Sequence, residues 1–244
     1  YGKDDELKLL YQADNVQIEK SETVKDIGVL MSDNLLFNDH ITEIKNKSKR
    51  VAAWIFRLVQ SRSAEVVMLL YKTYVRPHLE YSCSLWSPSE IQHISALESI
   101  QRSVTARIDG LDQLTYFDRL KKLDLFSLQR RRERYDIIHL WKIQQGIITN
   151  DLGLIFYETS RQGWKCRRNI IQSRHRKLST IRHNSFPHRA AALFNTIPKS
   201  VKNTDSLNVF KTRLDKYLKK VPDFPPVHGY VTRNHNSLLD WASC

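Results

Sequence analysis

Near the start of the chain, apolar and polar residues alternate with the period of two that is typical of a β-strand. The pattern breaks at Asp14-Asn15, a pair that tolerates the positive φ of a tight turn, so a β-hairpin is expected there. The alternating apolar positions are Leu7, Leu9 and Tyr11 before the turn and Val16 and Ile18 after it. A continuous apolar run, Ile27–Met31, predicts a further strand that is buried on both faces, or nearly so.

From Ile41 the period changes to that of an α-helix. Residues suited to an inward-facing stripe recur at alternating steps of three and four, at Ile41, Ile44, Ser48, Val51, Ile55 and Leu58. One helix with a single buried face is therefore expected over residues 41–58.

Four later segments show the same helical spacing. The first begins near Ser63, whose hydroxyl can cap a helix, and is interrupted by Pro77. The second runs from about Ser89 to Ile108, and the third covers Phe126–Gly146. The fourth is marked by Leu207, Phe210, Leu214 and Tyr217, and it is followed by Pro222, Pro225 and Pro226, which stop regular structure. The pattern predicts a mostly α fold with a small N-terminal β hairpin or strand element and a basic C-terminal helical region.

Composition places the chain among folded, basic proteins. Its 244 residues include 41% hydrophobic and 10% aromatic residues, too many for a disordered tail, and no apolar run approaches the roughly 18 residues needed to cross a membrane. The net charge is +13. The three cysteines are widely separated, which favours a reducing, intracellular compartment over a disulfide framework. Because the first residue is Tyr1 rather than Met, we expect the chain to be part of a longer protein.

Charge is unevenly distributed along the chain. Residues 1–40 are acidic, so the basic surplus lies downstream, largely on the expected helices. We take the following basic residues as candidate phosphate contacts: Lys45, Lys49, Arg50 and Arg57 in the helix over 41–58, Lys72 and Arg76 in the segment that begins near Ser63, Arg102 and Arg107 in the segment 89–108, and Arg130, Arg131, Arg132 and Arg134 in the segment 126–146. A run such as Arg130–Arg134 is more often a solvated helix face, but Glu133 alone does not balance it.

The segment 161–189 is strongly basic, because it contains nine Lys or Arg residues and no Asp or Glu. Its cations are Arg161, Lys165, Arg167, Arg168, Arg174, Arg176, Lys177, Arg182 and Arg189. Trp164 and Phe186 lie among them. Ammonium and guanidinium groups neutralise phosphates while aromatic faces stack on unpaired bases, so this segment predicts nucleic-acid binding. The alternative is that these charges form an ordinary solvated surface.

Metal and catalytic motifs are weak in this sequence. Cys166 has no histidine of the basic segment within the two-to-five-residue spacing of paired zinc ligands, so the set does not form two such pairs and no metal site is expected. No Walker loop, HExxH or GxSxG string occurs. The string Tyr1–Asp5 imitates a Tyr-x-Asp-Asp turn but has one residue too many, and Glu6 follows where an apolar strand should begin. We expect Tyr1–Asp5 to be a solvated loop and the chain to have no catalytic residue of its own.

Six motifs in the same order resemble the reverse transcriptases of non-LTR retrotransposons of the LINE, jockey-like type. They are Val24–Val29, Leu70–Tyr81, Trp86–Pro88, Leu97–Arg102, Leu120–Arg132, and Asn184–Phe186 together with Arg189, Asn195, Pro198 and Val201. They are distributed in this order across nearly the whole chain. Two positions depart from the family pattern: Phe194 replaces a frequent Trp and preserves an aromatic ring, while Pro187 replaces a Phe and alters the local turn.

The resemblance implies where the chain lies within an RNA-directed DNA polymerase. Residues 1–40 would be the end of the palm, 41–110 a thumb-like helical region, 111–155 linking helices and 156–244 the basic C-terminal region. The carboxylates that hold two magnesium ions would lie upstream, in the fingers and palm of the same polypeptide. The implied partners are an RNA template and a DNA primer or target. The implied location is a ribonucleoprotein in the nucleus and cytoplasm.

The sequence leaves a second interpretation open. The chain could be a domesticated retroelement remnant that acts as an RNA-binding or protein-interaction module without a polymerase partner. Where the chain binds nucleic acid, we expect it to bind through Lys and Arg, which release counterions from phosphates with little dependence on sequence.

Overall fold

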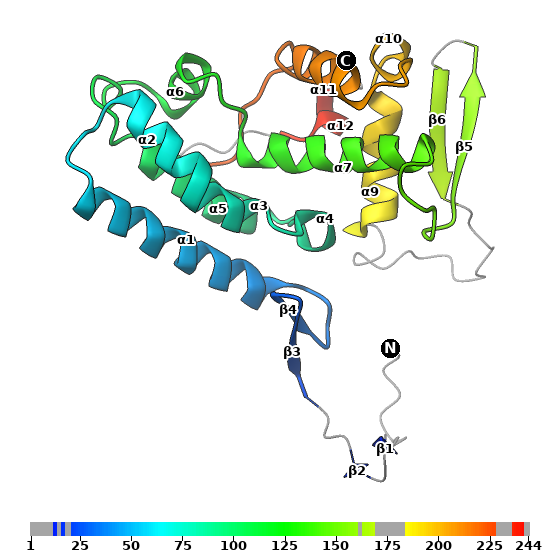
Figure 1. The fold of residues 1–244 in the computed structure, drawn as a ribbon, viewed down its shortest axis with the longest axis horizontal. Coiled ribbons are helices and arrows are strands. Elements are labelled where there is room, and N and C mark those ends of the chain that lie inside the picture. The colour runs from blue at the N-terminus through cyan, green and yellow to red at the C-terminus, as the bar shows by residue number, and fades with distance from the viewer. Residues whose placement is uncertain are drawn as a thin grey trace.

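Two helical clusters and three two-stranded antiparallel sheets make up the structure, a computed structural model that describes residues 12–13, 16–17, 21–160, 163–168, 184–227 and 236–241 (Figure 1). The expectation of a mostly α fold with a small β-hairpin is confirmed. Within the described residues, no helix is long and apolar enough to cross a membrane.

Short hairpins form the N-terminal part of the structure. β1 (Gln12–Ala13) pairs with β2 (Val16–Gln17), as the turn residues between them predicted. Leu7, Leu9, Tyr11 and Ile18 lie outside the described residues. β3 (Thr23–Asp26) pairs with β4 (Val29–Ser32).

The expected strand over Ile27–Met31 is wrong in its first two residues. Asp26 pairs with Val29, so Ile27 and Gly28 form the two-residue turn of the hairpin, both with positive φ (42° and 80°). Ile27 is 80% exposed, whereas Val29 is buried. A hairpin turn requires this backbone, and the glycine adopts it without strain, so local turn geometry overrides the apolar pattern.

The first helical cluster contains α1 (Asn38–Leu58), α2 (Ala64–Leu70), α3 (Arg76–Glu80), α4 (Cys83–Trp86) and α5 (Ile91–Thr105), with a π-helical turn, η1 (Tyr71–Val75), between α2 and α3. Of the stripe expected on α1, Ile41, Ile44, Ser48 and Ile55 are buried. Leu58 is 62% exposed, because the helix ends there and the chain leaves the core.

Pro77 does not interrupt the second helical segment. Ser63 caps it as predicted, its Oγ accepting a hydrogen bond from the amide of Val66. The segment then passes through η1 and continues as α3 to Glu80, with Pro77 in the first turn of α3. The wider π turn moves the preceding carbonyls away from the proline ring, which removes the clash that would break an α-helix.

The second cluster is built around α7 (Leu128–Gln144), which follows α6 (Tyr116–Lys122). Its other members are α9 (Phe186–Thr196), α10 (Lys199–Lys202), α11 (Leu207–Leu218) and α12 (Leu238–Trp241). Ser127 caps α7 through a hydrogen bond from the amide of Arg130 (3.0 Å). Leu128 belongs to the first core and Ile137 to the second, so α7 joins the two clusters.

The C-terminal region contains a hairpin that the sequence pattern did not predict. β5 (Leu154–Thr159) pairs with β6 (Gly163–Arg168), and the hairpin packs against α9 (Figure 1). The region is therefore not purely helical, and the start of the basic segment lies on a strand. After α11, the described residues 221–227 form no helix, as the prolines there predicted.

Candidate nucleic-acid interface

The first group of candidate cations lies on the side of α1 that faces away from the core. Because the apolar stripe of α1 packs inward, Lys49, Arg50 and Arg57 are exposed and Lys45 is partly exposed. In Figure 1, α1 lies at one edge of the molecule, with its neighbours on one side only. The position of α1 therefore leaves these cations available to a ligand.

A groove runs between α1 and α5, and we refer to it as the α1–α5 groove. It has a volume of about 300 Å³. Three cations line it, Lys45 and Lys49 from α1 and Arg107 from the turn after α5. The remaining lining residues are small or apolar: Ala52, Ala53, Phe56, Ser99, Ile100, Ser103 and Val104. The guanidinium of Arg107 lies 4.8 Å from the centre of the Phe56 ring, which holds this cation at the groove.

The cations around this groove have no acidic partners. Among the described residues, no carboxylate oxygen lies within 4.0 Å of the charged group of Lys45, Lys49, Arg50, Arg57, Lys72 or Arg107. Lys72 is exposed on η1; Arg102 is exposed on α5 but is not counted among these unpaired cations. Unpaired cations on one surface produce a positive potential that attracts polyanions.

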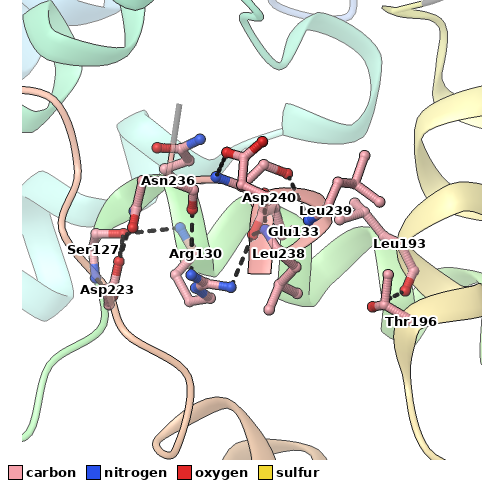
Figure 2. Close-up of polar contacts among 12 residues, drawn as sticks. Ser127, Arg130, Glu133, Leu193, Thr196, Asp223, Asn236, Leu238, Leu239 and Asp240 are labelled. Atoms are coloured by element: carbon pink, nitrogen blue, oxygen red, sulfur yellow. Dashed lines mark hydrogen bonds and ion pairs between the residues drawn. The ribbon is translucent and has the colours of Figure 1, made fainter. Parts of the chain in front are cut away.

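The arginines of α7 have a different environment, which corrects the expectation of an exposed helix face. Arg130 is 0% exposed, and its Nη2 donates to the carbonyls of Pro222 (3.0 Å) and Asn236 (3.3 Å). Its Nη1 lies 3.4 Å from the carboxylate of Glu133, which itself accepts from the amide of Leu238. Figure 2 shows Arg130 and Glu133 on α7 facing Asn236 and Leu238 of the C-terminal segment. Arg130 therefore fixes that segment to α7 and is not on the surface.

Of the other three arginines of the run, two form ion pairs and one is buried. Arg131 pairs with Glu80, with 3.0 Å between Nη2 and Oε2. Arg134 pairs with Asp215 (2.9 Å), which ties α7 to α11. Arg132 is 2% exposed, and burial beside other side chains lowers its pKa from the usual value. None of the four presents a free guanidinium to solvent, so we remove Arg130, Arg131, Arg132 and Arg134 from the candidate interface.

Two further candidates also have intramolecular partners. Arg76 lies 3.7 Å from Glu80, the carboxylate that Arg131 also contacts. Arg189 donates to Asp136 (2.8 Å) and to the carbonyls of Asn184 and Ser84 (2.6 and 2.9 Å), so it links α9, α7 and α4. Arg189 therefore links the two clusters, whereas Arg76 is paired within α3.

Only part of the basic segment 161–189 can be described. Lys165 Nζ donates to the carbonyl of Asn195 (2.8 Å), and Trp164 packs against the second core. Arg167 is exposed, with its guanidinium 5.7 Å from the centre of the Tyr157 ring. The side chain of Arg168 and the residues Arg161, Arg174, Arg176, Lys177 and Arg182 lie outside the described residues. Among the cations of this segment that the structure describes, Arg167 is the one classed as exposed to solvent.

Sequence reasoning missed Trp54, which is 62% exposed on α1. Arg50 precedes it by four residues and Arg57 follows it by three, so the three side chains share one face of the helix. The available signal was its position off the apolar stripe, between two arginines at helical spacing.

The most strongly shifted carboxyl groups are structural. Burial raises the pKa of Glu98 to about 7, against the opposing influence of Arg132, and Glu98 accepts hydrogen bonds from Tyr116 (2.7 Å) and the amide of Gln129 (2.9 Å). Burial likewise raises the pKa of Glu133 to about 7. Both groups join helices inside the fold. Within the described part of the chain, no cluster of three or more His, Cys, Asp or Glu side chains could hold a metal ion.

Comparison with known proteins gives two partial similarities. Over 102 residues, or 41% of the chain, the sequence is 28% identical to "Probable RNA-directed DNA polymerase from transposon X-element" of Drosophila melanogaster. Over 112 residues, or 45% of the chain, it is 25% identical to an uncharacterized protein of Caenorhabditis elegans. These matches span 11% and 57% of the two relatives, less than two thirds of either. No protein-family model and no solved structure matches the chain. The first similarity supports a distant relation to the RNA-directed DNA polymerase of a retrotransposon.

Proposed function

We propose that this chain is the nucleic-acid-binding C-terminal part of a non-LTR retrotransposon reverse transcriptase and that it holds the RNA-template and DNA-primer duplex through the α1–α5 groove. The partial similarity to the X-element polymerase supports the relation. The observation that carries the proposal is the set of cations at the groove, Lys45, Lys49 and Arg107, which have no carboxylate partners among the described residues.

The groove suits a phosphate backbone better than a small substrate. Its cations lie on α1 and on the turn after α5, and the first core holds these two helices together, so their positions do not depend on the ligand. Lysine binds phosphate as a point charge without demanding a particular base, which suits a protein that moves along its template. Polymerisation itself would be performed by carboxylates and magnesium in the fingers and palm of the same polypeptide.

The basic segment would add a second binding surface, for element RNA or for target DNA. Arg167 is exposed on β6, at the start of this segment. In this proposal, replacing Arg167, Arg168, Arg174 and Arg176 by Gln lowers the slope of log affinity against log salt concentration by about 0.7 to 0.9 for each phosphate that is no longer neutralised. An unchanged slope would leave the segment as an ordinary solvated surface.

The direct test reverses the charge of the groove. A fluorescently labelled RNA–DNA hybrid is titrated with the wild-type chain and with Lys45→Glu/Lys49→Glu at several salt concentrations. We expect the double variant to bind weakly and its salt slope to fall by about 1.4 to 1.8, because two phosphates are no longer neutralised.

The matched control is Lys216→Glu/Lys220→Glu, which changes the net charge equally on and just after α11. Both lysines are exposed, and neither has a carboxylate within 4.0 Å among the described residues. In Figure 1, α11 lies on the opposite side of α7 from α1. If both double variants weaken binding equally, net charge alone drives association and the groove is not the site.

A remnant without polymerase activity is the second candidate, and one observation favours it. The match to the worm protein covers 57% of that protein but the match to the X-element polymerase covers only 11%, so related sequence also occurs in a much shorter protein. Primer extension by the full-length gene product on a primed RNA template separates the two candidates. Template-dependent extension supports the polymerase, and hybrid binding without extension supports the remnant.

A further inference from the structure

A second face of α1 adjoins the α1–α5 groove, and we call it the Trp54 face. It is an open depression of about 540 Å³ lined by Arg50, Val51, Ala53, Trp54 and Arg57. Ala53 also lines the α1–α5 groove, so the two surfaces are continuous around the helix.

The position of Trp54 cannot be explained by packing within the described structure. The buried side of α1 carries Ile41, Ile44 and Ile55, whereas Trp54 points away from this core and is 62% exposed. Leu58, one turn later, is also 62% exposed. An exposed indole keeps a large apolar surface in water, which favours a partner that covers it.

The charges beside Trp54 indicate what that partner is. Arg50 and Arg57 flank the indole, and neither has a carboxylate within 4.0 Å among the described residues. A second copy of the chain docked symmetrically on this face would bring arginines against arginines, which is unfavourable. An unpaired nucleotide instead offers a flat base for the indole and phosphates for the guanidinium groups.

We propose that Trp54 stacks on an unpaired base of single-stranded RNA or DNA while Arg50 and Arg57 contact the phosphates on either side. Seven residues of α-helix separate the two arginines, a rise of about 10 Å, so phosphates of neighbouring nucleotides come within reach of both. The inference rests on the proposed function of the groove and adds to it a site for the strand beyond the duplex.

The test compares Trp54→Ala and Trp54→Phe with the wild-type chain on three probes: an unstructured single strand, a blunt RNA–DNA hybrid and the same hybrid with a single-stranded overhang. We expect Trp54→Ala to weaken single-strand binding about 5- to 100-fold, in line with the contribution of one stacked base. Trp54→Phe retains a ring and should recover most of that affinity. The affinity for the blunt hybrid should change less than about twofold in either variant. The overhang should increase the affinity for the hybrid in the wild-type chain and in Trp54→Phe, but not in Trp54→Ala.

Fluorescence provides a direct readout of stacking. The chain has five tryptophans, so the contribution of Trp54 is the difference between the quenching of the wild-type chain and that of Trp54→Phe on adding single strand. A quench that disappears in Trp54→Phe supports stacking on Trp54. Identical quenching in both proteins overturns it.

The remaining outcomes separate this inference from the proposed function. If Trp54→Ala binds single strand normally while Lys45→Glu/Lys49→Glu no longer binds the hybrid, the stacking site is wrong and the groove stands. If the groove variant binds the hybrid normally while Trp54→Ala no longer binds single strand, the groove proposal fails and the stacking site stands. A wild-type dimer that becomes a monomer in Trp54→Ala, measured by size-exclusion chromatography with light scattering, would make this face a protein interface and overturn the inference.

Discussion

Helices α1 and α7 carry similar basic sequences but use them in opposite ways. α1 lies at the edge of the molecule, and its cations outside the buried stripe face solvent (Figure 1). α7 contacts α3, α4, α5, α9 and α11, so it is covered on several sides. Three of its arginines, Arg130, Arg131 and Arg134, therefore pair with Glu133, Glu80 and Asp215, and the fourth, Arg132, is buried.

The difference teaches that a basic helix is a ligand surface only when the tertiary structure leaves its charges unpaired. A buried cation is costly unless it is hydrogen-bonded and paired, and Arg130, Arg131 and Arg134 of α7 are paired within the fold. An exposed cation contributes little to stability and remains available. The two helices thus divide their roles, with α7 stabilising the junction of the clusters and α1 presenting charge outward.

The largest expected effect follows from removing a buried arginine. Arg130→Ala leaves Glu133 without its cation and frees the carbonyls of Pro222 and Asn236, so we expect a decrease of about 3 to 5 kcal/mol in the free energy of unfolding. Denaturant unfolding measures it. Arg57→Ala on α1 is the control and should cost less than about 0.5 kcal/mol. Equal decreases would abolish the contrast between the two helices.

The second prediction concerns pH. Since burial raises the pKa of Glu98 from 4.5 to about 7, the folded chain retains a proton there that the unfolded chain releases at lower pH. The resulting stability is fully present below pH 4.5 and is lost as pH rises through about 7, a change on the order of 3 kcal/mol. Glu98→Gln cannot titrate at this position. As pH rises from 4.5 to about 7, the free energy of unfolding of this variant should therefore increase relative to that of the wild-type chain. A constant difference across the window would show that Glu98 titrates normally.

One ion pair on each helix allows a finer comparison, in which smaller changes in the free energy of unfolding are expected. A double-mutant cycle on Arg134 and Asp215 should give a coupling of about 1 kcal/mol, because this pair is partly buried. Lys25 and Glu43, a more exposed pair between β3 and α1, should give about 0.3 kcal/mol. A stronger coupling for the exposed pair would contradict the assignment of structural charge to α7.

The smallest effect on stability is expected at the groove. Lys49→Gln should change the free energy of unfolding by less than about 0.5 kcal/mol, since Lys49 is exposed and has no acidic partner among the described residues. Its salt slope for hybrid binding should nevertheless fall by about 0.7 to 0.9. Thermal unfolding together with anisotropy titration measures both quantities, and a destabilised protein with an unchanged slope would reverse the role of this residue.

Local patterns predicted the helices well because their causes are local. The stripe of α1 and the caps at Ser63 and Ser127 depend on residues within one or two turns of the chain. Features set by packing were missed, including the continuation of the second helical segment past Pro77 and the hairpin β5–β6. In the candidate interface, the cations of α1 were found, whereas the exposure of Trp54 was not.

The sequence by itself determined the helical periodicity, the net charge of +13 and the concentration of that charge downstream of residue 40. Only the tertiary structure decided which cations are free, because several of the carboxylates that pair with the others are distant in sequence. Arg131 and Glu80 are 51 residues apart, Arg189 and Asp136 are 53 apart, and Arg134 and Asp215 are 81 apart. Periodicity specifies which face of a helix is apolar, but the partner of a charge is fixed only when the chain has folded and distant segments meet.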